Sequence, residues 1–168
     1  MWPFSETFTE KSDLSMAENN SPDFKDALRR AAALCSRQEQ CTGQIREKLR
    51  SWNVDAELAQ RVILKLHEEK FLDDRRYARF YVRDKFKLNR WGKIKITAML
   101  RQKGIQDEII AEALEQINAE DYYKTCADLI HTKAAGLNEK NQFVRKGKLF
   151  RFAASRGFES DLIHRILS

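Results

Sequence analysis

One pattern occurs three times along the sequence, and this repetition constrains the fold more than any single motif does. Each copy is centred on a residue suited to a left-handed turn: Asn53, Gly104 and Gly157, at spacings of 51 and 53 residues. An apolar residue follows each of them directly, and other apolar residues recur at four-residue steps on both sides. Four-residue steps are typical of helices, whereas strands need a period of two. Because Gly and Asn favour left-handed helix caps, every copy is predicted to be a helix, a tight turn and a second helix.

Repeats of this length are typical of arrays in which each unit buries its apolar face against its neighbours. We therefore expect an all-α protein of three tandem three-helix repeats that form an elongated, curved array. The expected repeats span residues 21–70, 71–118 and 119–168. Residues 1–20 are polar and acidic and lack periodicity, so we expect a disordered N-terminal tail there.

Nine helices follow from the periodicity. The first is expected to begin at Ser21, a good N-cap, with Pro22 at the first helical position, and to end near Cys35. The other eight are, in chain order, Thr42–Trp52, Asp55–Glu69, Asp73–Leu88, Trp91–Lys103, Asp107–Ile117, Glu120–Ala134, Glu139–Ser155 and Ser160–Leu167. No segment predicts a strand.

The composition argues against a secreted, membrane or metal-binding protein. The first 20 residues lack the basic start and apolar core of a signal peptide, and no apolar run is long enough to span a bilayer. Cys35, Cys41 and Cys126 have no CxxC spacing, so we interpret them as reduced, mostly packed thiols. We therefore expect a cytoplasmic monomer that needs no membrane, metal or other cofactor.

Motifs that would indicate an enzyme are weak. Asp73 and Asp74 point about 100° apart on a helix, and no third carboxylate nearby completes a metal site or a nuclease centre. Roles as N-cap and first-turn acid fit them better. Two Gly-Lys pairs lack the preceding glycine of a phosphate loop, and the three histidines are too dispersed for metal ligation. We expect no catalytic activity.

Charge is distributed unevenly along a chain whose net charge is +6. Residues 75–103 contain eleven Lys or Arg and one acid, and residues 140–156 contain six basic residues and no acid. Residues 105–121 carry six acids instead. Such blocks predict a surface with separate basic and acidic faces. A polyanion or an acidic protein groove is the natural partner of the basic part.

The helix that begins at Asp73 carries the sharpest candidate surface. With Tyr77 at 0° and a rotation of about 100° per residue, five cations fall within an arc of about 80°. These cations are Arg76, Arg79, Arg83, Lys87 and Arg90. Phe86 borders the arc, and two interpretations of it stay open: it stacks on a base or fills a partner's pocket, or it packs between repeats. The cations likewise either bind a partner or form a solvated face.

Several segments resemble the RecX family of bacterial recombinase regulators. They are Phe71–Arg83, Trp91–Lys93 with Ile96, Leu100 and Arg101–Ile105, Ala27-Leu28, Cys35–Arg37, Ile45–Leu49 and Arg156–Phe158. The resemblance spans residues 24–168 and is specific, because three unlike repeats match in order. The third repeat departs from the pattern, since Ala153 replaces a large apolar residue and the loop before it is long.

The resemblance implies a non-catalytic modulator that binds RecA nucleoprotein filaments, lies along the filament groove and inhibits recombinase and ATPase activity. In addition to RecA binding, weak contact with single-stranded and double-stranded DNA is expected. The expected contact residues are Arg76, Arg79, Arg83, Phe86, Lys87, Arg90, Lys93, Lys146, Lys148 and Arg151. The alternative is a sequence-nonspecific DNA-binding helical module that acts without a recombinase. The sequence leaves open whether protein or DNA contacts dominate, and whether the second or the third repeat makes them.

Overall fold

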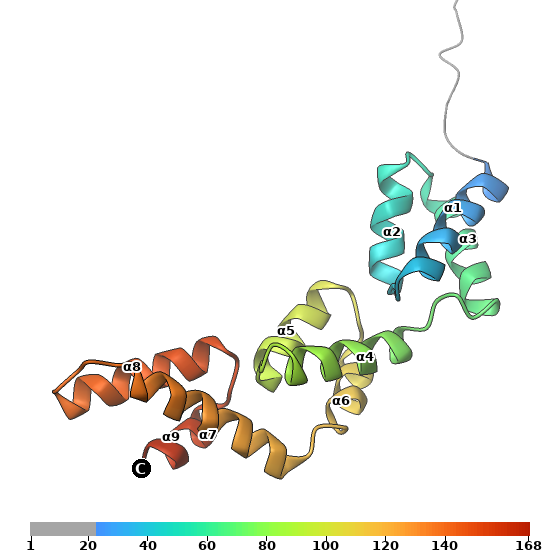
Figure 1. Ribbon diagram of the computed structural model, residues 1–168. Coiled ribbons are helices and arrows are strands. Elements are labelled where there is room, and N and C mark those ends of the chain that lie inside the picture. The colour runs from blue at the N-terminus through green and yellow to red at the C-terminus, as the bar shows by residue number, and fades with distance from the viewer. Residues whose placement is uncertain (1–22) are drawn as a thin grey trace, which may run out of the picture.

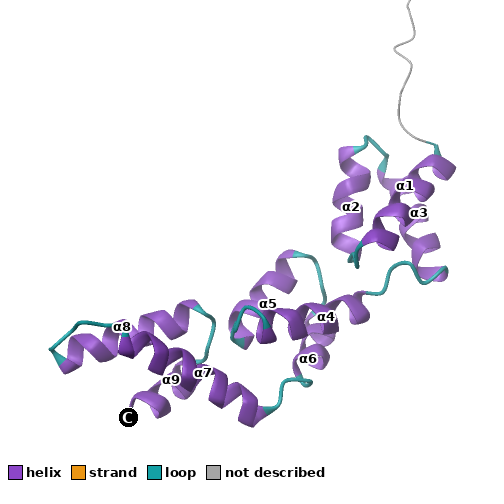
Figure 2. Cartoon of the chain, in the orientation of Figure 1, coloured by secondary structure: helices purple, strands orange, loops and turns teal. Residues whose placement is uncertain are grey.

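The computed structural model describes residues 23–168, and within that range the chain is helical and contains no strand (Figures 1 and 2). Its helices are α1 (Phe24–Arg37), α2 (Thr42–Ser51), α3 (Ala56–Glu68), α4 (Asp74–Lys87), α5 (Lys93–Gln102), α6 (Asp107–Leu114), α7 (Ala119–Ala135), α8 (Gln142–Ser155) and α9 (Ser160–Leu167). The expected tail and the expected N-cap Ser21 lie outside the described residues. The cap of α1 is Asp23, whose carboxylate accepts a hydrogen bond from the amide of Asp26.

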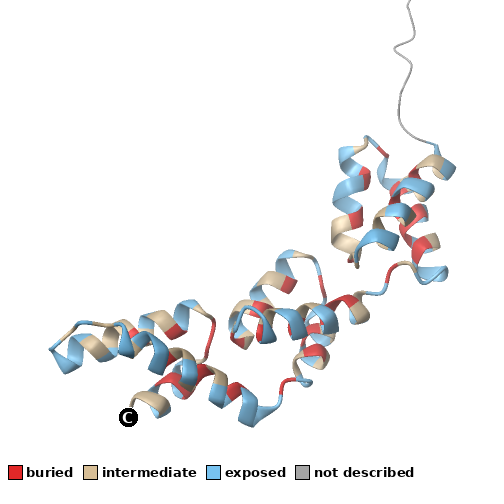
Figure 3. Ribbon diagram, viewed as in Figure 1, coloured by how far each residue is buried: buried red, intermediate tan, exposed pale blue. Residues whose placement is uncertain are grey.

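The helices form three units, α1–α3, α4–α6 and α7–α9, which follow one another along a bent line (Figure 1). Each helix packs mainly against the other two helices of its own unit. Buried residues accordingly lie on the helix sides that face the centre of each unit (Figure 3). The predicted all-α array of three tandem three-helix repeats is confirmed.

The same turn ends the second helix of every unit and explains the repeated sequence pattern. Asn53, Gly104 and Gly157 have φ angles of 57°, 77° and 91°, so the predicted left-handed conformation is confirmed. The amide of Asn53 donates to the carbonyl of Arg50, and the amide of Val54 donates to that of Leu49. The other two turns make the corresponding bonds, Gly104 to Arg101, Ile105 to Leu100, Gly157 to Ala154 and Phe158 to Ala153. This is the Schellman arrangement, in which the residue after the left-handed position packs back on the helix.

Neighbouring units meet where the second helix of one unit begins. Between the first and second units, the amide of Thr42 donates to the carboxylate of Asp74 at 2.8 Å. The Cys41 thiol lies 3.7 Å from the carbonyl oxygen of Lys103, just before the turn of the second unit. A Cβ on Gly43 would overlap that same carbonyl. The start of α2 therefore packs against backbone atoms of the second unit.

The second and third units repeat this junction with more backbone hydrogen bonds. The amide of Gly92 donates to the carbonyl of Arg156 at 2.8 Å, and that of Ile94 donates to Gly157 at 3.0 Å. The amide of Lys93 donates to the Tyr122 hydroxyl at 2.9 Å. Each unit thus holds the helix start of the unit before it.

The three cores are not equally connected. Residues of α1–α3 enclose a separate apolar cluster, whereas one continuous cluster runs through α4–α9 and also includes Cys41, which lies just before α2. The ring of Tyr122 bridges the second and third units, with centroids 5.9 Å from Phe86 and 5.2 Å from Phe158. The second and third units therefore share a core, and the first unit is attached to that core through buried Cys41 together with polar and backbone contacts.

Alanine substitutions at the two glycine turns should differ in cost. Gly104→Ala should lower the free energy of unfolding by about 1–2 kcal/mol, because its left-handed backbone disfavours a Cβ that otherwise has open space. Gly157→Ala should lower the free energy of unfolding by about 1–3 kcal/mol more than Gly104→Ala does, because its Cβ would also overlap the backbone of Lys95. Urea unfolding followed by circular dichroism measures both. Equal losses would show that the junction is not closely packed at Gly157.

Candidate interaction surface

Arginines of α4 line an open groove on the middle unit. Four arginines of α4 line it, together with the acid just before the helix, an aromatic ring and a glutamine after α6: Arg75, Arg76, Arg79, Arg83, Asp73, Phe80 and Gln116. The groove has a volume of about 490 Å³. We call it the arginine groove. Its guanidinium groups are suited to bidentate contacts with carboxylates or phosphates.

Acids from distant parts of the chain neutralise some of this charge. Glu112 of α6 pairs with both Arg75 and Arg79, the latter at 2.5 Å. The hydrogen bond from Arg79 holds the pKa of Glu112 below its usual value. Arg76 is turned toward the first unit, where its Nε donates to Glu39 at 2.8 Å. Arg76 therefore takes part in the groove and in the contact between units.

The prediction that Phe86 contacts a partner is wrong. Phe86 is only 7% exposed, because Tyr122 of the third unit covers its ring. The alternative interpretation, packing between repeats, is the one observed. Phe80 is instead the exposed aromatic of α4, at 41%, and the guanidinium of Arg83 lies 4.8 Å from its ring centroid. In the helical projection, Phe80 borders the edge of the cation arc opposite to Phe86. This position is the sequence signal that could have identified Phe80 as the exposed aromatic.

The other cations expected on this stripe lie apart from the groove. α4 ends at Lys87, and Arg90 follows in a left-handed conformation with φ 53°, so a helical angle cannot place Arg90. The side chains of Lys87 and Arg90 are exposed. Lys93 belongs to the junction with the third unit, where its ammonium lies 5.0 Å from the ring centroid of Tyr122.

A second basic surface, which the sequence interpretation missed, lies on another side of α4. Three lysines alternate with two half-buried aromatic rings. The Lys103 ammonium lies 5.8 Å from the Tyr81 ring centroid, and Lys85 lies 5.4 Å from Tyr81 and 5.2 Å from Trp91. Lys95 lies 4.6 Å from Trp91. We call these five residues the lysine–aromatic surface. Its members come from α4, α5 and two turns, and this spread hides them from a single-helix analysis.

The third unit contains the last three expected contact residues. Lys148 donates to Glu139 at 2.7 Å and stabilises the loop before α8, and this hydrogen bond lowers the pKa of Glu139. Lys146 and Arg151 are exposed and flank a groove between α8 and α9. Only two of the three are therefore well placed to meet a partner.

Comparison with known protein families identifies the family of this chain. Models of the first, second and third three-helix domains of RecX match residues 27–66, 73–114 and 120–167. These matches cover well over half of the chain and occur in the same order. The chain belongs to the RecX family. The resemblance seen in the sequence is thereby confirmed.

Individual RecX proteins agree with this assignment. Regulatory protein RecX of Pelodictyon phaeoclathratiforme is 32% identical over 144 residues, which cover 86% of each chain. That of Clostridium botulinum (strain Alaska E43 / Type E3) is 35% identical over 122 residues, 71% of this chain, but the match spans only 57% of the relative. The crystal structure of RecX from Lactobacillus salivarius has the same fold, with a TM-score of 0.79 at 24% identity over 86% of this chain and 94% of that one.

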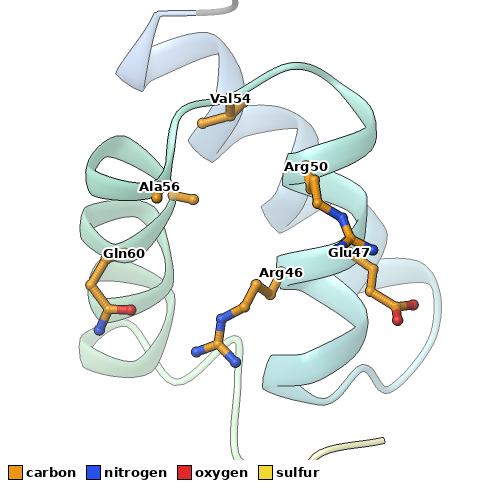
Figure 4. A pocket seen from close by; sticks show the side chains of 7 residues that line it. Arg46, Glu47, Arg50, Val54, Ala56 and Gln60 are labelled. Atoms are coloured by element: carbon orange, nitrogen blue, oxygen red, sulfur yellow. The ribbon is translucent and has the colours of Figure 1, made fainter.

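This RecX-family chain also has a hollow of about 570 Å³ in its first unit, between α2 and α3. Figure 4 shows Arg46 reaching from α2 into the space between the helices, while the carboxylate of Glu47 points away from it. Val54 and Ala59 form apolar parts of the wall. The hollow is open and has few polar groups that converge on one point, unlike a typical small-molecule site.

Other kinds of site find little support in the described part of the chain. Within residues 23–168, no three His, Cys, Asp or Glu side chains gather in a way that could hold a metal ion. No helix in that range has the length and apolar character needed to cross a membrane. Cys35, Cys41 and Cys126 are free thiols, and burial raises the pKa of each, to about 11 for Cys35 and Cys126.

Removing Arg79 should raise the pKa of Glu112 toward its usual value. The folded-state pKa of Glu112 is depressed, so its ion pairs stabilise the fold above the unfolded-state pKa. That contribution is lost as the pH falls through the folded-state pKa. A carboxyl-carbon NMR titration of wild type and Arg79→Ala measures the change. Arg101→Ala, which removes a pair with Asp107 instead, should leave Glu112 unchanged. The same pKa in Arg79→Ala as in wild type would contradict the pairing.

Proposed function

We propose that this chain binds RecA nucleoprotein filaments and inhibits recombinase and ATPase activity, acting as a cytoplasmic monomer that catalyses no reaction. Membership of the RecX family supports a regulatory role, since its relatives are named regulatory proteins. The resemblance of its motifs to that family supports RecA as the partner. Its three units follow one another in a row (Figure 1), an extended arrangement that suits contact along a helical filament.

The arginine groove is the observation that carries this proposal. It lies on the middle unit, and the side chains of Arg79 and Arg83 remain 62% and 48% exposed despite their ion pairs. Exposed guanidinium groups held on a helix pair well with acidic side chains of a protein or with phosphates. An ion pair with Glu112 keeps Arg79 in place and leaves donors for a partner, because a guanidinium has five N–H groups.

The lysine–aromatic surface favours a second candidate function, a DNA-binding module that acts without a recombinase. Lys85 and Lys103 have no ion pair with any acid of residues 23–168, and lysines of this kind neutralise phosphates. A salt titration separates the two functions. Affinity for single-stranded DNA should fall with a log–log slope of about 0.7 per phosphate contact if DNA dominates. Contacts made mainly with RecA should decline less steeply.

The deciding experiment for the proposed function is RecA ATP hydrolysis on single-stranded DNA with increasing amounts of this protein. We expect suppression below one copy per RecA protomer, because one elongated molecule would restrain several protomers. Binding of equal strength to naked DNA, with ATP hydrolysis unchanged, would establish the DNA-binding module instead.

Charge reversal in the arginine groove should weaken filament inhibition. Arg79→Glu/Arg83→Glu should raise the half-inhibitory concentration at least about tenfold, since it replaces attraction with repulsion at two contacts. The fold should persist, because exposed charges contribute little to stability. Circular dichroism checks the fold and ATP hydrolysis measures inhibition.

A matched control changes the net charge equally in the first unit. Lys25→Glu/Lys48→Glu reverses two exposed lysines of α1 and α2 and should retain inhibition. Lys146→Glu/Arg151→Glu tests the competing view that the third unit makes the main contact. Full inhibition by the α4 variant, together with loss in the third-unit variant, would move the principal contact to α8.

A further inference from the structure

Arg76 connects the arginine groove with the first unit. Its side chain lines the groove, and it also lines a hollow of about 570 Å³ at the junction of the first and second units. Its Nε donates to the carboxylate of Glu39 at 2.8 Å, whereas its terminal nitrogens lie 3.3 to 3.5 Å from the carbonyl oxygens of Lys70 and Phe71. One strong contact and several long ones therefore hold this guanidinium against the first unit.

Asp73 is the pivot between the first and second units. Phe71 and Leu72 before it belong to the first unit, because their amides donate to the carbonyl of Leu66 and both pack in the core of that unit. Helix α4 begins directly after Asp73, which is itself extended, with φ −154° and ψ 103°. A single residue thus joins the two bodies, and Arg76 reaches back across it.

A turn of the first unit at this pivot would expose little apolar surface. The first unit encloses its own cluster, and among residues 23–168 Cys41 is its one member of the cluster that fills the other two units. Other contacts across the junction are polar, such as the amide of Thr42 with the carboxylate of Asp74. Exchanging a polar contact for water costs little compared with opening an apolar core. The first unit is therefore the part of the array that separates most easily.

We propose that a carboxylate that enters the arginine groove releases the first unit by taking Arg76 from it. A two-pronged contact with a carboxylate needs two neighbouring N–H groups of one guanidinium. The terminal N–H groups of Arg76 make only the long bonds to backbone carbonyls, so a carboxylate would replace weak contacts with short, charged ones. The incoming charge would also repel the carboxylates of Glu39 and Asp73. Arg79 and Arg83 line the same groove and would hold the same acidic partner.

This inference rests on the proposed function for the identity of the partner, since the carboxylate would belong to a RecA filament. Linkage makes the effect reciprocal: a ligand that loosens the junction must bind more tightly when the junction is already loose. This reciprocity separates a switch from a clamp that serves only the fold.

The exchange rate of the Thr42 amide reports the state of the junction. This amide lies at a helix start, has no acceptor in its own helix and donates to Asp74 across the junction. A polyglutamate peptide serves as the probe, and NMR hydrogen exchange at constant ionic strength is the measurement. Saturating peptide should speed the exchange of Thr42 in the wild type at least about fivefold. The amide of Lys93, at the junction of the second and third units, should be unaffected.

Glu39→Ala removes the partner of Arg76 and keeps every arginine of the groove. Its Thr42 amide should exchange rapidly without peptide, and the peptide should bind at least about fivefold more tightly than it binds the wild type. Glu47→Ala removes an exposed acid of the same unit and is the matched control, with wild-type exchange and affinity. Arg83→Gln removes a groove arginine away from the junction, so more peptide should be needed for the same response.

The outcomes are separate from those of the proposed function, because the peptide experiment contains no RecA. Filament inhibition can fail while the coupling stands, and the reverse. The coupling proposal fails if the peptide does not bind, or if it binds and leaves the exchange of Thr42 unchanged or slower. Faster exchange of Lys93 as well would mean general loosening of the fold and would also overturn it, as would an unaltered response in Arg83→Gln.

Discussion

The backbone amides at the starts of α2 and α5 are the groups on which the array depends. A helix start leaves its first N–H groups without partners inside the helix, and they must be satisfied elsewhere. The amides of Thr42 and Lys93 find acceptors in the next unit, the carboxylate of Asp74 and the hydroxyl of Tyr122. Turn carbonyls of the third unit accept the amides of Gly92 and Ile94. The starts of α2 and α5 are therefore completed by the unit that follows them, so the capping of these helices and the order of the units depend on each other.

This dependence explains why charges on α4 serve two purposes. The first unit has its own core, so its attachment rests on one buried thiol, Cys41, and on polar contacts such as Thr42 with Asp74 and Arg76 with Glu39. The second and third units are already joined by buried aromatic rings and need no such pairs. Arg76 accordingly pairs across the junction with the first unit, whereas Arg79 and Arg83 pair within their own unit and stay largely exposed.

Local signals made the fold predictable, and distant contacts made the site less so. The Schellman turn sets its requirements within a few residues, so Gly104 and Gly157 identify it in the sequence. The fate of Phe86 depends on Tyr122 of another unit, and the charge of the groove depends on Glu112 of another helix. A helical projection of α4 shows neither Tyr122 nor Glu112, because both residues belong to other helices. It also assumed a helix through Arg90, although α4 ends at Lys87.

The middle unit presents two basic faces of different chemistry. On α4, Tyr81 and Lys85 lie about 40° and 80° from Tyr77, whereas Arg79 and Arg83 lie at about 200° and 240°. Guanidinium groups favour planar, two-pronged contacts with carboxylates, and compact ammonium groups suit phosphates. A nucleoprotein filament offers both kinds of acid, on protein and on DNA. Under the proposed function, the arginines of α4 would meet the protein of the filament, and Lys85 with Lys95 and Lys103 of the neighbouring α5 region would meet its nucleic acid. Mixed contacts of this kind would favour the filament over either component alone.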